Sequence, residues 1–104
     1  MNGFFKKLLG MEKKVNYKEL IAQGAVIIDV RTKGEYQSGH IEGSVNIPLD
    51  TLPNQLSRLK KDKPAITCCA SGMRSASAKN ILLRNGFAEV HNGGGWVSLQ
   101  KKIR

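Results

Sequence analysis

The hydrophobic positions of this chain predict strands that alternate with helices. Residues 25–30 form a continuous apolar run rich in β-branched residues, and residues 66–69 form a second run, as is typical of strands buried on both faces of a sheet. Residues 45–48 are expected to be extended, and residues 88–91 to form a short last strand. Capping residues and apolar positions three or four apart predict helices over residues 17–23, 32–38, 50–59 and 96–103. A further helix is expected to begin at Met73 or Ser75 and to end at residue 84. This order indicates an α/β fold with a small, mainly parallel sheet flanked by helices.

Two capping sequences mark the starts of the first helices. Asn16-x-x-Glu19 and Thr32-x-x-Glu35 have the spacing of a capping box, in which the two side chains bond each other's backbone N–H groups. We therefore expect each helix to begin directly after the first residue of its pair.

The third helix and the turn before the last helix follow from similar rules. Asp50 is placed to cap a helix whose buried stripe is Leu52, Leu56 and Leu59. Residues 92–95, an asparagine and three glycines, predict a flexible turn.

The length of 104 residues suits one domain with one modest core. We expect residues 14–104 to form this domain and residues 1–13 to precede it as an extension. The extension lacks the uninterrupted apolar stretch of a signal peptide. No apolar run approaches the roughly 20 residues that span a bilayer, so no transmembrane segment is expected.

The chain is strongly basic, with a net charge of +9 from 17 Lys and Arg against 8 Asp and Glu. Such a charge attracts anionic substrates, or it simply solvates the surface. The sequence has no zinc-finger spacing and no aromatic pattern of an RNA-binding module, so nucleic acid is not an expected partner. His40 and His91 have no acidic partner at ligand spacing, so neither a metal site nor a cofactor is expected.

The stretch CCASGMRS, residues 68–75, carries the candidate chemistry. An apolar run precedes it and a helix follows, so a strand should pass through a small-residue loop into a helix. Successive N–H groups of such a loop form an anion cradle, which the helix dipole strengthens. Arg74 adds a forked cation for oxyanions. A thiol in this field ionises readily, and the thiolate is the reactive form, so Cys69 is the candidate nucleophile.

The two cysteines are adjacent and cannot join distant parts of the chain, which indicates a reducing compartment, expected to be the cytoplasm, or thiol chemistry. Because strand side chains alternate, Cys68 should point away from the loop into the core. The alternative role for Cys68 is a resolving thiol that exchanges with Cys69.

Four stretches together resemble one known family. Residues 69–75, CASGMRS, fit the C-x-x-G-x-R-S active-site loop of rhodanese-like sulfurtransferases. Residues 26–31, VIIDVR, resemble the family's buried strand that ends in D-V-R, and residues 39–48, GHIEGSVNIP, resemble its G-H-I-x-G-A-x-N-I-P segment. Residues 93–96, GGGW, resemble a shortened G-G-x-x-x-W region. The resemblance covers about residues 14–102.

This resemblance implies a rhodanese-like three-layer fold and an enzyme, a thiosulfate or persulfide sulfurtransferase. Cys69 would take sulfur from a small anionic donor as a persulfide and pass it to a thiol or cyanide acceptor, with a sulfur-relay protein as a further partner of what we expect to be a monomer. The expected substrate-binding residues are those of the loop after Cys69: Ala70, Ser71, Gly72, Met73, Arg74 and Ser75. Many relatives carry arginine where this chain has Ala70, and the loss of that cation weakens the case for thiosulfate as donor.

Two alternatives stay open at this stage. Rhodanese-fold relatives include cell-cycle phosphatases, so a phosphatase or arsenate reductase is the first. The second is a non-catalytic binding module or persulfide carrier. In the phosphatase relatives five residues separate the cysteine from the arginine, whereas four separate Cys69 from Arg74. The tighter loop favours a persulfide sulfur over a tetrahedral phosphate. Asp29, at the end of its strand, is expected to pair with an arginine or to cap nearby backbone.

Overall fold

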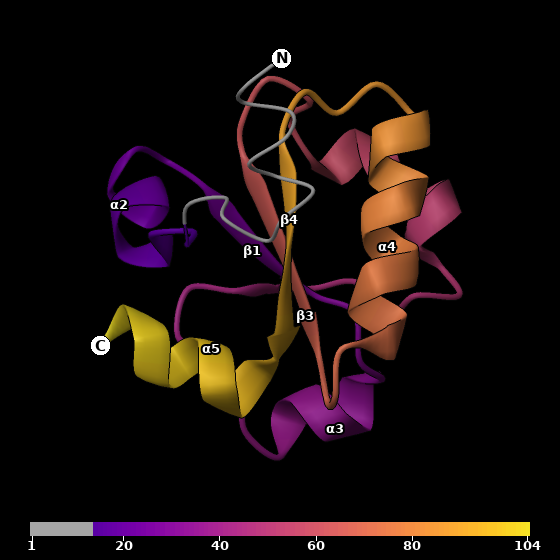
Figure 1. Ribbon diagram of the computed structural model, residues 1–104. Coiled ribbons are helices and arrows are strands. Elements are labelled where there is room, and N and C mark those ends of the chain that lie inside the picture. Colours follow the sequence, from indigo (N-terminus) through magenta and orange to yellow (C-terminus); the bar gives the residue numbers. More distant parts are fainter. Residues whose placement is uncertain (1–13) are drawn as a thin grey trace.

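A computed structural model describes residues 14–104 as one parallel sheet with helices on both faces (Figure 1). The strands lie in the order β2-β1-β3-β4, and all three neighbouring pairs are parallel. The strands are β1 (Val26–Asp29), β2 (Val45–Asn46), β3 (Ala65–Cys69) and β4 (Val90–Gly95). The helices are α2 (Tyr17–Ala22), α3 (Lys33–Gln37), α4 (Met73–Arg84) and α5 (Trp96–Ile103), with 3₁₀ turns η1 (Leu52–Asn54) and η2 (Leu56–Arg58). The predicted α/β class is confirmed.

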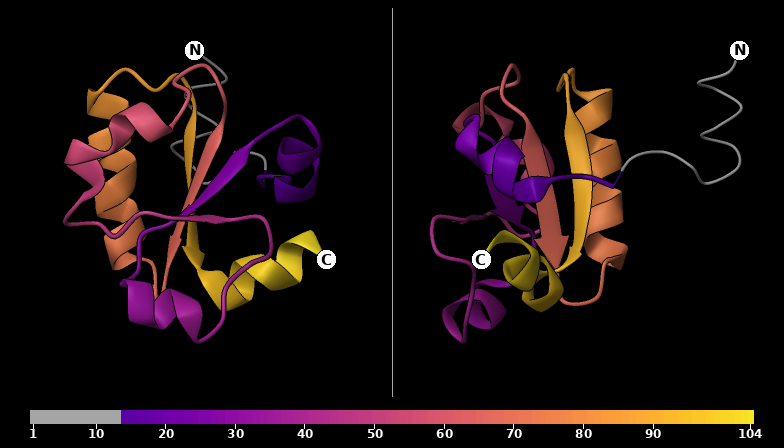
Figure 2. Two further views of the ribbon diagram at one scale, coloured as in Figure 1. Left: turned by 180° about the vertical axis from the view of Figure 1, so that it is seen from behind. Right: turned by 60° about the vertical axis from the view of Figure 1, so that its left-hand side comes forward.

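Alternation along β1 and β3 divides the core into two halves, one on each face of the sheet (Figure 2). Ile28 and Cys69 face α4 and the 3₁₀ turns. Ile27, Ile66 and Cys68 face α2 and α5. Strands covered on both faces must be apolar throughout, which explains the continuous runs in the sequence.

The predicted caps begin α2 and α3. Asn16 Oδ1 accepts a hydrogen bond from the Glu19 N–H at 3.0 Å. Thr32 and Glu35 form a complete capping box, with the Glu35 carboxylate accepting from the Thr32 N–H at 2.9 Å. Both predicted helix starts are therefore confirmed.

The predicted third helix is wrong in kind. Asp50 does not cap a helix; the segment forms η1 and η2 instead, with Thr51 in the cap position of η1 and no side-chain capping bond. Gln55 separates the two turns because its backbone, at φ −126° and ψ 19°, departs from the helical values. The leucines still face the core as predicted: Leu52 is buried, and Leu56 and Leu59 pack against the same cluster.

The predicted flexible turn at residues 92–95 is also wrong, since these residues continue β4. Two of the glycines are required there by close backbone approach. A Cβ on Gly93 would lie 2.8 Å from the Thr67 carbonyl oxygen, and a Cβ on Gly95 would lie 2.9 Å from the Ala70 carbonyl oxygen. The glycines thus let β4 run tightly against β3 and the loop that follows it.

The predicted extension, residues 1–13, lies outside the described residues, so the division into extension and domain stays a prediction. Within residues 14–104, no helix combines the length and apolar character needed to cross a bilayer.

Candidate active site

The loop after β3, residues 69–75 and called here the Cys69 loop, wraps backbone N–H groups around one sulfur atom. β3 ends at Cys69, and α4 begins at Met73. Gly72 makes the turn between them with φ +113°, a left-handed value that favours glycine. The Gly72 N–H donates to Cys69 Sγ at 2.9 Å and the Ser75 N–H at 3.3 Å. The local sequence therefore forms the predicted strand, loop and helix around the candidate nucleophile.

The electrostatics of the loop favour the thiolate of Cys69. Burial acts to raise the pKa of Cys69, which is only 1% exposed. Hydrogen bonding with the Ser75 hydroxyl and N–H, followed by the Gly72 and Ser71 N–H groups, outweighs burial and holds this pKa below its usual value. Cys69 is thus a buried thiol tuned toward its reactive form.

The Ser75 side chain lies next to the Cys69 sulfur and is hydrogen-bonded in turn to Asn92. Ser75 is fully buried, and its Oγ lies 3.4 Å from Cys69 Sγ. The same hydroxyl donates to Asn92 Oδ1 at 2.6 Å, and that oxygen also accepts from the Gly94 N–H at 2.9 Å. Sequence reasoning found Ser75 but missed Asn92, because residues 92–95 were assigned to a turn. Strand alternation from buried Val90 would have placed Asn92 on the α4 face.

Arg74 is held by a carboxylate from α3. Its Nη1 lies 2.7 Å from Glu35 Oε1, and its Nη2 lies 3.0 Å from Glu35 Oε2, a two-pronged ion pair (Figure 1 shows α3 beyond the carboxyl end of β3). The hydrogen bonds that Glu35 accepts from Arg74, followed by the one that it accepts from the Thr32 N–H, lower the pKa of Glu35 to about 2. That Arg74 faces a bound anion stays a prediction.

The outer residues of the loop are open to solvent. Ala70 and Ser71 are exposed, and the side chain of Met73 is 81% exposed at the start of α4. They contribute backbone to the loop and leave its mouth uncharged.

Cys68 lies on the other face of the sheet, as strand alternation predicts. It is fully buried among Ile27, Ile66 and Leu99. Burial, followed by the neighbouring Asp29 carboxylate, raises the pKa of Cys68 to about 12. Cys68 therefore remains a protonated core thiol.

The comparison with known families agrees with this geometry. The family profile described as "Rhodanese-like domain" matches residues 14–102. The chain belongs to the rhodanese-like domain family.

Relatives within the rhodanese-like family differ in their names. The chain is 37% identical to the thiosulfate sulfurtransferase GlpE of Stutzerimonas stutzeri over 76 residues, which are 73% of this chain and 70% of GlpE. It is also 37% identical to the tRNA uridine(34) hydroxylase of Cronobacter sakazakii over 87 residues, 77% of this chain but only 25% of that protein. A solved rhodanese with anions from Escherichia coli matches with a TM-score of 0.68 and 32% identity, covering 72% of this chain and 91% of the other. The recognised family and its fold are thus confirmed.

The D-V-R stretch, residues 29–31, makes contacts at the end of β1. Asp29 pairs with Arg31 through Nη2 at 2.8 Å and Nε at 2.9 Å, as expected for an arginine partner. Arg31 also lies over the Trp96 ring, 4.6 Å from its centroid. His40 stacks on Tyr36 at 3.7 Å between ring centroids. These contacts are structural.

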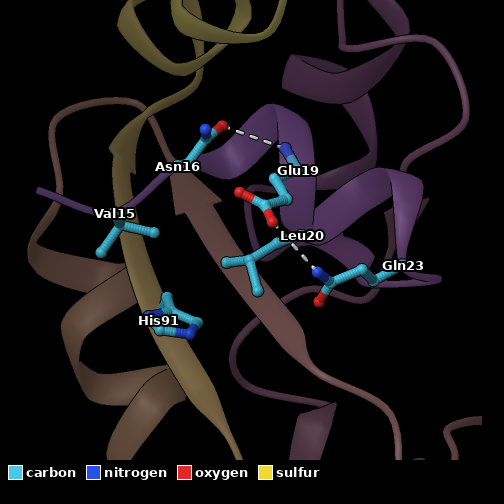
Figure 3. A pocket seen from close by; sticks show the side chains of 6 residues that line it. All are labelled: Val15, Asn16, Glu19, Leu20, Gln23 and His91. Atoms are coloured by element: carbon cyan, nitrogen blue, oxygen red, sulfur yellow. Dashed lines mark hydrogen bonds between the residues drawn. The ribbon is translucent and has the colours of Figure 1, made fainter.

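A separate cavity of about 240 Å³ lies between α2 and β4 (Figure 3). It is lined by Val15, Asn16, Glu19, Leu20, Gln23 and His91. None of these residues belongs to the Cys69 loop, so the cavity is separate from the candidate site. Among the residues from 14 onward, no three His, Cys, Asp or Glu side chains gather as metal ligands would.

Proposed function

We propose that this rhodanese-like domain is a sulfurtransferase that carries sulfane sulfur as a persulfide on Cys69. The observation that supports this most directly is the surroundings of Cys69 Sγ, which accepts hydrogen bonds from the N–H groups of Gly72 and Ser75. The pKa of this thiol is lowered. Hydrogen-bond donors that stabilise a thiolate also stabilise the terminal sulfur anion of a persulfide.

In the first step, the Cys69 thiolate attacks the outer sulfur of the donor. A new S–S bond forms while the donor's own bond to that sulfur breaks, and the leaving group departs with the bonding electron pair. Thiosulfate would release sulfite, and an alkyl persulfide would release a thiolate. No external oxidant or reductant is needed, because the sulfane sulfur keeps its oxidation state.

In the second step, an acceptor attacks the terminal sulfur of the Cys69 persulfide. A thiolate acceptor becomes a persulfide and cyanide becomes thiocyanate, while Cys69 leaves as a thiolate ready for the next donor. The partners in this proposal are a small anionic donor and a thiol or cyanide acceptor, including an acceptor cysteine on a sulfur-relay protein. The protein would act as a monomer in the cytoplasm, where both free cysteines stay reduced.

Mass spectrometry of the intact protein and its peptides tests this proposal. After incubation with thiosulfate or glutathione persulfide and removal of the donor, Cys69 should carry one additional sulfur, which cyanide then removes as thiocyanate. Cys69→Ser should gain none, and Cys68→Ser should gain it as the wild type does.

A parallel assay with p-nitrophenyl phosphate distinguishes the phosphatase alternative. Phosphate release that depends on Cys69, together with no sulfur on Cys69 from either donor, would overturn the sulfurtransferase assignment. The expected result is sulfur on Cys69 and phosphate release at the level of Cys69→Ser.

A further inference from the structure

The ion pair between Glu35 and Arg74 uses the guanidinium that the Cys69 loop would offer to an anion. Both carboxylate oxygens of Glu35 are engaged, at 2.7 and 3.0 Å from the two terminal nitrogens of Arg74. This is the geometry in which arginine would clamp the oxygens of a sulfonate. An oxyanion that used the same face of Arg74 would have to displace Glu35.

Glu35 is fixed in place by contacts apart from Arg74. Its Oε1 accepts hydrogen bonds from the Thr32 N–H at 2.9 Å and the Thr32 hydroxyl at 3.1 Å. The low pKa of Glu35, about 2, keeps the carboxylate ionised throughout the neutral range. Displacing it would also break the capping box that begins α3.

The loop has no second side-chain cation to replace Arg74. The position after Cys69 is Ala70, and the following Ser71 is uncharged. The hydrogen bonds to Glu35 are the largest cause of the raised pKa of Arg74, and the negative charge of Cys69 acts in the same direction, so the guanidinium lies within electrostatic range of the sulfur. With Glu35 paired to it, the net charge beside the sulfur is close to zero, and backbone N–H groups provide most of the attraction for anions.

Donors differ in the charge they bring to this site. Thiosulfate carries two negative charges, so when the Cys69 thiolate attacks it, three negative charges come together in the site. An alkyl persulfide that reacts in its protonated form brings no charge, so the assembly carries one negative charge. The Cys69 thiolate takes the outer sulfur together with its proton as a Cys69 persulfide, and the alkyl thiolate leaves with the electron pair. The first reaction benefits most from a free cation.

We propose that Glu35 is a specificity-determining residue that neutralises Arg74 and thereby selects alkyl persulfides over dianionic thiosulfate as sulfur donors. This inference rests on the proposed sulfurtransferase function and adds the chemical class of its donor.

The test compares kcat/KM for thiosulfate and for 2-hydroxyethyl persulfide, which has no charged group apart from the persulfide itself, with one acceptor thiol, in the wild type and Glu35→Gln. Glutamine keeps the size of the side chain and can maintain the capping box, while its charge is lost. The ratio of thiosulfate to persulfide kcat/KM should rise about three- to tenfold, mainly through a lower KM for thiosulfate, as expected for one unscreened charge at a partly exposed site.

Glu42→Gln is the matched control, because Glu42 is an exposed carboxylate that lines a cavity beside α2 and α5 rather than the Cys69 loop. It makes the same change in net charge and should leave the ratio within twofold. The double variant Glu35→Gln/Arg74→Gln should lose the gain, since no cation is left to be freed.

A second single variant keeps the proposal testable if Glu35→Gln folds poorly. Arg74→Gln leaves the Glu35 carboxylate unpaired, and it should reduce thiosulfate turnover more than persulfide turnover. Equal changes with both donors, in either variant, would show that the pair only braces α3 against the loop and would overturn the selectivity. Absence of sulfur on Cys69 from both donors in the wild type would instead overturn the proposed function itself.

Discussion

Cys68 and Cys69 are joined by one peptide bond, yet the structure gives them opposite chemistry. Both are buried, at 0% and 1% exposure. Cys69 points toward α4, where N–H groups from Gly72 and Ser75 converge on its sulfur and its pKa is lowered. Cys68 points toward α2 and α5, where apolar neighbours and the Asp29 carboxylate raise its pKa to about 12.

This contrast shows that burial alone does not decide the reactivity of a cysteine. Desolvation opposes ionisation of both thiols, and only the sulfur supplied with hydrogen-bond donors overcomes it. Strand alternation sets the face of the sheet to which each side chain points. The loop that follows the strand supplies hydrogen-bond donors to Cys69, the last residue of the strand. The first prediction tests this division most strongly.

Cys69→Ser should reduce sulfur transfer to background, because a serine hydroxyl does not ionise in the neutral range. Cys68→Ser should keep at least half of the wild-type turnover, with a loss of stability from placing a hydroxyl in an apolar cluster. Steady-state transfer from glutathione persulfide to a thiol measures both, with circular dichroism as the control for folding. Equal inactivation of the two well-folded variants would mean that the cysteines act as a unit.

The second prediction concerns stability at alkaline pH. The pKa of Cys68 is about 12 in the folded protein and about 8.5 when unfolded, so the stabilising effect of the buried thiol is complete below pH 8.5 and is lost as the pH rises toward 12. Between pH 8 and 10, the wild type should lose on the order of 2 kcal/mol more free energy of unfolding than Cys68→Ala. Urea titrations at the two values measure this. Parallel losses in both proteins would contradict the raised pKa.

The third prediction concerns the hydrogen bonding around Cys69. Ser75→Ala removes the hydroxyl next to the sulfur, and the pKa of Cys69 should rise. Turnover at neutral pH should fall only about threefold, because a more basic thiolate is also more nucleophilic. Iodoacetamide alkylation against pH reports the midpoint. Ser77→Ala, on an exposed part of the same helix, is the matched control. An unchanged alkylation midpoint in Ser75→Ala would show that the Ser75 hydroxyl does not affect the pKa of Cys69.

The smallest expected effect comes from Asn92→Ala. Asn92 Oδ1 accepts a hydrogen bond from the Ser75 hydroxyl at 2.6 Å and so competes with Cys69 for the single hydroxyl proton. Without this acceptor the hydroxyl proton is shared between the thiolate and the Gly72 carbonyl oxygen, 3.0 Å away, so the alkylation midpoint of Cys69 should fall slightly. The sign is the useful result, since it is opposite to that of Ser75→Ala. A rise in the midpoint would mean that Asn92 acts mainly by holding the loop in shape.

What could be predicted from sequence was local. The strand, loop and helix around Cys69 follow from neighbouring residues, and the inward side of Cys68 follows from the twofold repeat of a strand. The caps at Asn16 and Thr32 each involve a residue three positions away. These features require no knowledge of how distant segments meet.

What could not be predicted depends on contacts between segments. Glu35 already had a local explanation in its capping box, so its pairing with Arg74, 39 residues away, left no separate signal. The glycines of β4 look like a turn until Thr67 and Leu99 are seen to occupy the space that a side chain at Gly93 would need. Asn92 was hidden by the same misassignment.

The shared use of Glu35 Oε1 links the Cys69 loop to the start of a helix. One oxygen accepts from the Thr32 N–H, which begins α3, and from Arg74, which belongs to the Cys69 loop. A ligand that draws Arg74 away changes how firmly this oxygen is held, and by thermodynamic reciprocity the fraying of α3 changes the affinity for that ligand. The amide hydrogens of Thr32 and Glu35, which the capping box holds, should therefore exchange with solvent at a rate that depends on the anion present. Slow exchange at these amides would report an intact ion pair without any turnover taking place.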